Sequence, residues 1–343
     1  MHSRRERGRT LPAVGIIVNP KHLSSHRAYS ELVAAMRPLG IRSRTMTTTR
    51  ARDGAWQAEE LVTWGADVVI ILGGDGTIRA TGPVLADSET PVLLIPTGTA
   101  NVLSRHVGIT STRHAITHCL RALSTGLDPT AGWLLVPINE VDIRLRDGGR
   151  RHTVFLSLAG IGGDARAVAH HHIAPGLLGY VWGAARALFA ADLTPTADGI
   201  TVDGESARAG DPADDRTTAR RNETGARPGS VWSVMASKVA RPAGPVSVFP
   251  DARIDAETFS VLGVGPLPHT LLMRIRAWSS IGLSCLSGSP ESNALMDYRK
   301  ATGVTVRLTT PAPVQLDGEL IEDCVELHLS AGERGLLVSA PTP

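Results

Sequence analysis

The chain has 343 residues, enough for two domains of ordinary size. Apolar residues make up 42% and charged residues 20% of the sequence, so the chain can bury a core, and global disorder is excluded. The net charge of +2 lacks the basic excess expected of a nucleic-acid-binding protein. Its three cysteines form no CxxC pair, which excludes a disulfide framework and a structural zinc site. We therefore expect a globular, cytoplasmic protein.

Short apolar runs alternate with helical patterns over roughly the first 130 residues. Strands are predicted at 14–18, 41–48, 67–72 and 92–95, and helices at 27–39, 54–64, from 77 onward and at 100–106. This alternation predicts a Rossmann-like α/β domain with a mostly parallel sheet. We place this domain at 1–131 and expect the last strand, within 333–343, to rejoin it.

Strand patterns dominate the second half of the chain. They occur at 136–145, 153–158, 231–236, 246–249, 259–264, 304–308 and 325–329. Runs of strands after a βα region predict a second domain, a mainly antiparallel β-sandwich at 132–332. Residues 203–230 contain no large apolar side chain and are predicted to form a mobile loop inside a hairpin.

The longest apolar stretch, 176–191, is interrupted by Arg186. It is shorter than the roughly 20 residues that a bilayer requires. We interpret it as an amphipathic helix that lies in the core or along a cleft, with a lipid-facing surface as the alternative. Any membrane contact is therefore expected to be peripheral, at the inner face of the membrane.

The strongest chemical signal is a glycine-rich turn placed directly between a buried strand and a helix. Its residues are Gly73, Gly74, Asp75, Gly76 and Thr77. Glycines let the backbone approach a ligand closely, and the N-terminus of the following helix offers N–H groups to a phosphate. No lysine follows at the spacing of a Walker loop. Asp75 would repel a phosphate, so it predicts Mg²⁺ binding or proton acceptance, with a plain helix cap as the alternative.

A second turn, at 96–101, follows the next predicted strand. Because the carboxyl ends of parallel strands meet at one edge, this turn is expected to share a crevice with the first. Thr99 could donate its hydroxyl to a phosphate, and the alternative is a helix N-cap by Thr97 or Thr99. Asn19 and Pro20, at the end of the first strand, could form a third wall.

Two carboxylates flank a glycine late in the chain, at Asp317, Gly318 and Glu319. This spacing predicts a turn at a strand end, with both acids near one point. One acid could accept a hydroxyl proton while the other orients it or holds a metal. The alternative is an ordinary solvated hairpin turn.

Taken in order, these motifs resemble the diacylglycerol kinase catalytic-domain family, which includes bacterial lipid kinases, diacylglycerol kinases and sphingosine kinases. Residues 18–20, 155–165 and 249–253 also look like blocks of this family. The resemblance extends from about residue 14 to residue 340. It implies an NAD kinase/diacylglycerol kinase-like fold with an ATP site in the cleft between an α/β domain and a β-sandwich domain.

The resemblance also implies roles for individual residues. Nucleotide contacts fall on Asn19, Pro20, Lys21, Thr48, Gly73, Gly74, Asp75, Gly76, Thr77, Thr99 and Asn101. Glu319 is implied as the proton acceptor, beside Asp317, and Asp75 as a further catalytic residue. The resemblance implies that Asp142 helps to order Mg²⁺ through water. Asp75 is a second candidate for binding the metal.

The sequence departs from the family pattern at several positions. Val102 stands where many members carry an acid, and Ala256 stands where some members hold a structural Mg²⁺ with a second aspartate. Gly163 replaces a usual aromatic residue, which alters the expected acceptor pocket. These departures put parts of the family's metal network in doubt for this chain.

We predict an ATP- and Mg²⁺-dependent lipid kinase that transfers the γ-phosphate to a lipid hydroxyl. Diacylglycerol is the default acceptor, and sphingoid or other alcohols stay open. The alternatives are an NAD kinase-like or non-lipid small-molecule kinase, and a catalytically weak protein that binds a nucleotide or a lipid. The expected partners are ATP and the hydroxylated substrate, and a homodimer is left open.

Overall fold

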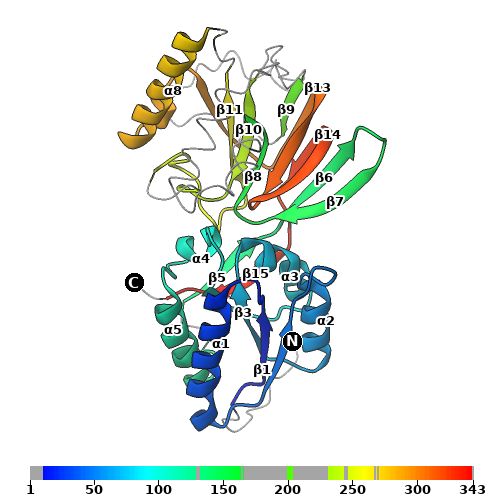
Figure 1. The fold of residues 1–343 in the computed structure, drawn as a ribbon, viewed down its shortest axis with the longest axis vertical. Helices are drawn as coiled ribbons and strands as arrows, with labels where there is room; N and C mark the ends of the chain where they lie inside the picture. The colour runs from blue at the N-terminus through cyan, green and yellow to red at the C-terminus, as the bar shows by residue number, and fades with distance from the viewer. Residues whose placement is uncertain are drawn as a thin grey trace, which may run out of the picture. The chain divides into compact units, whose positions relative to one another are not determined.

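The computed structural model describes residues 11–128, 132–163, 165, 199–203, 231–242, 246–265, 268 and 270–341. The chain divides into two compact units (Figure 1). The first contains Met1–Val136 and Arg334–Pro343, and the second contains Pro137–Glu333. The helix predicted at 176–191 and nearly all of the loop predicted at 203–230 lie outside the described residues.

The first unit is built on a six-stranded sheet with the order β2-β1-β3-β4-β15-β5. Its strands are β1 (Val14–Val18), β2 (Ser43–Thr47), β3 (Val68–Gly73), β4 (Val92–Pro96), β5 (Trp133–Pro137) and β15 (Gly335–Ser339). The pairs from β2 through to β15 are parallel. Every residue of β1, β3 and β4 is buried, as expected for strands that are covered on both faces. The predicted α/β domain is confirmed.

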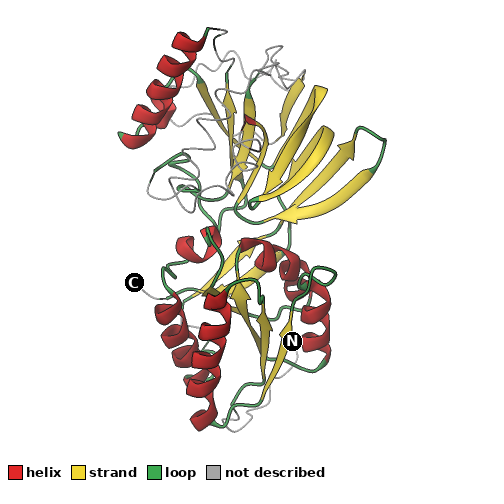
Figure 2. Ribbon diagram, viewed as in Figure 1, coloured by secondary structure: helices red, strands yellow, loops and turns green. Residues whose placement is uncertain are grey.

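Helices cover this sheet, as Figure 2 shows in red. They are α1 (Leu23–Met36), α2 (Ala55–Thr63), α3 (Asp75–Asp87), α4 (Val102–His106) and α5 (Thr112–Ser124). Helix α1 packs with α5, and α2 packs with α3. All four helices predicted in this unit begin at other residues than expected: α1 begins at Leu23 rather than at 27, and α2 begins at Ala55 rather than at 54. Helix α3 begins at Asp75 because Gly74 is its N-cap, and α4 begins at Val102 because Asn101 has a left-handed φ of 47°.

The second unit contains one antiparallel sheet with the path β12-β11-β10-β8-β13-β14-β6-β7, and β9 pairs with β13. The strands are β6 (Asn139–Leu145), β7 (Arg150–Phe155), β8 (Leu158–Gly162), β9 (Gly199–Asp203), β10 (Ser233–Ser237), β11 (Phe259–Val264), β12 (Met296–Ala301), β13 (Gly303–Leu316) and β14 (Glu319–Ser330). Phe155 of β7 and Phe259 of β11 contact edge to face, although their strands lie near opposite ends of this path. The sheet therefore folds over on itself around one core, which gives the predicted sandwich-like domain.

Several predicted elements of the second unit are wrong. The strand predicted at 136–145 is interrupted at Ile138, and 246–249 is not a strand. Within the described residues, β9 pairs with β13, and β10 pairs with β8 and β11. Helix α8 (Leu271–Leu286) was not predicted, because its apolar residues are spread around the helix and show no single stripe. Within the described residues, no helix is long and apolar enough to cross a membrane.

Candidate functional site

In the first unit, three loops meet at the carboxyl ends of neighbouring parallel strands. The backbone N–H of Asn19 donates to the carbonyl of Leu72 at 2.9 Å, because β1 and β3 are paired. The Asn19 side chain then donates from Nδ2 to the Thr77 hydroxyl at 2.9 Å. Thr48, which follows β2, donates its backbone N–H to Val18 at 2.9 Å. The predicted residues Asn19, Thr48 and Thr77 are therefore brought together.

The two glycine-containing turns contact each other through their backbones. A Cβ atom placed on Gly98 would lie 2.6 Å from the Cα of Gly74, closer than real atoms approach. The backbone N–H of Thr97 donates to the carbonyl of Gly73 at 3.1 Å. Asn101 closes the second turn, since its Nδ2 donates to the Gly98 carbonyl at 2.8 Å and its Oδ1 accepts from the Gly98 N–H at 3.0 Å. Only glycine permits this approach at position 98.

Helix α3 begins inside this cluster of loops. Its N-cap, Gly74, has no side chain to satisfy the first N–H groups of the helix, and Gly76 is exposed. Such a helix N-terminus attracts a phosphate through its N–H groups and the positive end of its dipole. Pro20, Lys21 and Thr99 are also exposed, and the Lys21 N–H donates to the Asn19 Oδ1 at 3.1 Å. The residues present therefore fit a nucleotide phosphate.

Asp75 is a capping residue, the alternative given for it, but the helix that it caps is α4. Its carboxylate is buried, and its two oxygens accept the N–H groups of Val102 and Leu103, both at 3.0 Å. Burial raises the pKa of Asp75, while these two N–H groups and the Arg105 charge act in the opposite direction. Asp75, the first residue of α3, therefore caps α4. Because Asp75 and Val102 are 27 residues apart in the sequence, no local sequence pattern predicts this contact.

The predicted N-cap by Thr97 or Thr99 is wrong. The N-cap of α4 is Asn101, which makes no side-chain capping bond. The Thr97 hydroxyl instead accepts a hydrogen bond from the Ser25 hydroxyl at 2.9 Å, and its carbonyl accepts one from Ser24 at 3.2 Å. These two serines on α1 also went unrecognised in the sequence. They fix the second turn to the helix that follows β1.

In the second unit, Asp317 and Gly318 form the two-residue turn of the hairpin between β13 and β14, and Glu319 follows as the first residue of β14. Asp317 and Gly318 have φ angles of 48° and 86°, the left-handed geometry that tight hairpins prefer. The carboxylate of Asp317 turns inward and accepts three backbone N–H groups, from Leu156 at 2.9 Å, Ser157 at 2.8 Å and Leu158 at 3.0 Å. Asp317 therefore holds the loop between β7 and β8.

Glu319 differs from Asp317 in its exposure. It is the first residue of β14, pairs across the hairpin with Leu316, and is exposed. Glu319 therefore faces solvent, whereas the oxygens of Asp317 accept backbone N–H groups. The structure separates the two acids into an anchoring group and an accessible group.

Asp142 lies on β6 and is exposed. Its Oδ1 is 2.9 Å from the Nδ1 of His152, and the Nε2 of His152 is 3.2 Å from Glu140. The hydrogen bond to Asp142 is the main cause of a raised pKa at His152. In the described part of the chain, no three His, Cys, Asp or Glu side chains gather as a metal site requires.

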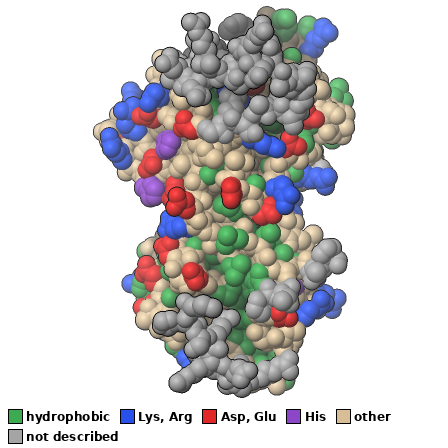
Figure 3. Space-filling view, turned by 180° about the vertical axis from the view of Figure 1, so that it is seen from behind, with side chains coloured by type: hydrophobic (Ala, Val, Ile, Leu, Met, Phe, Trp, Pro, Cys, Tyr) green, Lys and Arg blue, Asp and Glu red, His purple; other side chains and the backbone are tan. Residues whose placement is uncertain are grey.

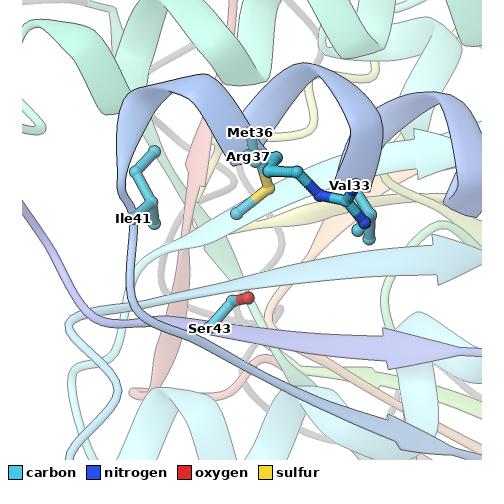
Figure 4. Close-up of a pocket in the computed structure, with 5 residues that line it drawn as sticks. All are labelled: Val33, Met36, Arg37, Ile41 and Ser43. Atoms are coloured by element: carbon cyan, nitrogen blue, oxygen red, sulfur yellow. The ribbon is translucent and has the colours of Figure 1, made fainter.

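A small hollow in the first unit lies away from these loops. It is lined by Val33, Met36, Arg37, Ile41 and Ser43 (Figure 4). Ser43 is the first residue of β2, so the hollow is at the amino end of the strands, opposite the edge where the glycine turns meet. We assign it no role in the candidate site.

In sequence, known proteins resemble this chain mainly over its first unit. Residues 13–130 match the family described as "Diacylglycerol kinase catalytic domain". The chain is 28% identical over 138 residues to "Probable lipid kinase YegS-like" from Stenotrophomonas maltophilia and 33% identical over 103 residues to "Probable lipid kinase YegS" from Escherichia fergusonii. These matches cover 36% and 29% of this chain, and they span only 44% and 34% of the two relatives.

Solved structures resemble the chain over nearly its whole length. A "putative diacylglycerol kinase" from Bacillus anthracis str. Sterne superposes with a TM-score of 0.65 at 18% identity, over 98% of both chains. A second structure from that organism, of a diacylglycerol kinase, gives a TM-score of 0.57 at 14% identity, over 97% of this chain and 98% of the other. At such identities the likeness establishes the fold. The resemblance that the motifs indicated is confirmed.

Proposed function

Because residues 13–130 match the family described as "Diacylglycerol kinase catalytic domain", we propose that the protein transfers the γ-phosphate of ATP to a lipid hydroxyl. The observation that carries this proposal is the contact between Gly74 and Gly98 beside the N-terminus of α3. A backbone cradle at a helix N-terminus binds phosphate well, and phosphoryl transfer depends mostly on positioning and charge neutralisation.

The loops of the first unit would hold the nucleotide. The N–H groups at the start of α3 would bind the phosphates, and the loop residues would shape the remainder of the site: Asn19, Pro20, Lys21, Thr48, Gly73, Thr99 and Asn101. A bound Mg²⁺ would supply neutralisation of the phosphate charge. Asp75 would position these loops through α4, because both of its oxygens accept backbone N–H groups.

The second unit would serve the acceptor alcohol. Glu319 would accept the proton of the acceptor hydroxyl as its oxygen attacks the γ-phosphorus. A new O–P bond forms, the bond from phosphorus to the β–γ bridging oxygen breaks, and ADP leaves. Asp317 would act as the positioning residue that fixes the hairpin which carries Glu319.

One observation favours a second candidate, nucleotide binding with weak transfer. Asp75 is the only acid in the two glycine turns, 73–77 and 96–101, and both of its oxygens already accept N–H groups, from Val102 and Leu103. Val102 itself supplies no carboxylate. A weakened metal network of this kind would bind ATP and transfer its phosphate slowly.

The test is transfer of labelled γ-phosphate from ATP–Mg²⁺ to separate acceptors. The acceptors are diacylglycerol, ceramide, sphingosine, undecaprenol and NAD, each presented with the full chain. Label in one lipid supports the proposal and identifies the acceptor. Label in NAD alone would assign an NAD kinase-like activity. Bound ATP without transfer to any acceptor would favour the second candidate.

A further inference from the structure

Helix α8 exposes an unusual amount of apolar surface. Of the eleven exposed large hydrophobic side chains in the described chain, six belong to this helix: Leu271, Leu272, Met273, Ile275, Leu283 and Leu286. Their exposed fractions run from 42% to 71%. Isolated exposed leucines are ordinary, but a contiguous set on one element marks an interaction surface. In Figure 3, hydrophobic and basic side chains meet at the upper right, over α8.

The helix is held firmly from its inner side. Ala277, Ile281 and Cys285 are buried in a cluster of the second unit that includes Phe249. Trp278 meets Trp232 edge to face, with ring centroids 5.1 Å apart. The outer residues therefore cannot turn inward, and their exposure is a fixed property of the domain.

The outer face is apolar with protruding leucines. At about 100° per residue, Leu272, Ile275, Leu283 and Leu286 project away from the buried side of the helix. The residues between them, Ser279 and Gly282, are small and exposed. The large side chains therefore protrude beyond their small neighbours and could insert into a fluid apolar phase.

The charge on the helix has one sign. Its only ionisable side chains besides Cys285 are Arg274 and Arg276, and no acid occurs in it. Arg274 donates to the carbonyl of Pro268 at 2.8 Å, and Arg276 is exposed at the margin of the leucines. An apolar face bordered by arginine and free of carboxylates complements an anionic lipid surface.

We propose that the outer face of α8 (Leu272, Ile275, Arg276, Leu283 and Leu286) docks on an anionic lipid surface. The choice of a lipid occupant rests on the proposed function, whose acceptor is a lipid. A second copy of the chain fits less well. A helix of 16 residues is about 24 Å long and about 10 Å wide. This footprint is far below the roughly 800 Å² that each partner of a stable dimer buries.

The test is sedimentation of the full chain with vesicles, without ATP. The vesicles contain phosphatidylcholine alone or phosphatidylcholine with added phosphatidylglycerol. A triple variant is expected to lower the partition coefficient between vesicles and water at least about tenfold. Its substitutions are Leu272→Ser, Leu283→Ser and Leu286→Ser. Arg276→Gln should lower it about fivefold, on anionic vesicles only. The matched control is Leu23→Ser on α1, where an equally exposed leucine should have no effect.

Failure of the wild type to bind vesicles, or an unchanged partition of the triple variant, would overturn the proposal. A triple variant that changes only the oligomeric state, measured by light scattering, would assign the face to a second copy. Phosphoryl transfer to a short-chain diacylglycerol dispersed as monomers tests the proposed function separately. The triple variant should retain that transfer at the wild-type rate. If the wild type binds vesicles through α8 but transfers no phosphate, the proposed function alone is contradicted.

Discussion

Asp317 and Glu319 are two residues apart and belong to one hairpin, but they differ in what surrounds their carboxylates. Three backbone N–H groups converge on Asp317, while Glu319 is exposed on the first position of β14. Hydrogen bonds to an ionised group each stabilise a fold by more than neutral ones do. Substitution of the two acids should therefore affect different properties of the protein.

Asp317→Asn is expected to lower the free energy of unfolding by about 1.5–3 kcal/mol. The reason is that the NH₂ group of the asparagine would face backbone N–H groups that now donate to a carboxylate oxygen. Thermal or urea denaturation measures this change. Asp323→Asn is the matched control, since Asp323 is exposed on β14 and also has a positive φ, of 60°. Equal stability of the two variants would contradict the anchoring role of Asp317.

Lys238 is a second residue whose role depends on burial. Its side chain is fully buried after β10, and its Nζ donates to the carbonyls of Ala256 and, at 3.0 Å, Thr258. Its backbone N–H donates to Ser157 at 2.9 Å, and the N–H of Ser157 binds Asp317. Lys238 thereby connects the loop near 256 to the acidic hairpin.

Burial lowers the pKa of Lys238 to about 8 from its ordinary 10.5, against the opposing charges of Asp255 and Glu257. Between these two pH values the unfolded chain holds more protons than the folded one, so this group makes stability rise with pH. The melting temperature of the wild type should rise relative to that of Lys238→Met as the pH increases from about 8 to about 10. Lys300→Met, at an exposed position, should show no such divergence. Parallel curves for Lys238→Met and the wild type would contradict a pKa of Lys238 that is lowered by burial.

At the scale of elements, the contact between the two glycine turns is the feature most sensitive to a single methyl group. Gly98→Ala places a Cβ 2.6 Å from the Cα of Gly74, so the turns must separate. ATP affinity should fall at least about tenfold, by about 1.4 kcal/mol or more. Gly282→Ala is the control, because nothing lies within 4 Å of its added Cβ and the residue belongs to α8, outside the glycine turns. Equal ATP affinity of the two variants, measured by calorimetry, would show that the contact does not shape the site.

Helices and strands were predicted well from the sequence where a single hydrophobic pattern determines them. Strands β1, β3 and β4 are continuous apolar runs. The loops of the candidate site were predicted because Asn19 and Pro20 follow β1 and glycine turns follow β3 and β4. The partners of Asp75 and Asp317 were not predictable, since each carboxylate binds N–H groups remote in the chain. Helix α8 was missed for a different reason. Its outer residues are as apolar as its inner ones, so the period of a surface helix is lost.

At the scale of the whole molecule, the chain returns to its first unit at the very end. Strand β15 lies between β4 and β5, and its Leu336 and Val338 are fully buried. Arg334 precedes it and contacts Asp87 of α3 at 2.9 Å. The six-stranded sheet is therefore completed only when the second unit has been synthesised.

Deletion of residues 334–343 should destabilise the first unit severely, because it removes an interior strand and leaves the edge of β4 open. The expected result is loss of a cooperative thermal transition and of soluble yield. Arg334→Ala removes only an exposed ion pair and should change stability by less than about 1 kcal/mol. A truncated chain that melts like the wild type would contradict the assigned strand order.

The central claim is that the chain transfers the γ-phosphate of ATP and that Glu319 accepts the acceptor's proton. Single-turnover transfer to the acceptor found in the lipid panel tests this most directly, with wild type, Glu319→Gln and Glu322→Gln compared at equal folded yield. Glu322 is an exposed acid on the same strand and provides the control. We predict that Glu319→Gln lowers the rate at least about a hundredfold, the usual contribution of a general base, with unchanged ATP affinity, and that Glu322→Gln reacts as the wild type. Equal rates for all three proteins would contradict the account.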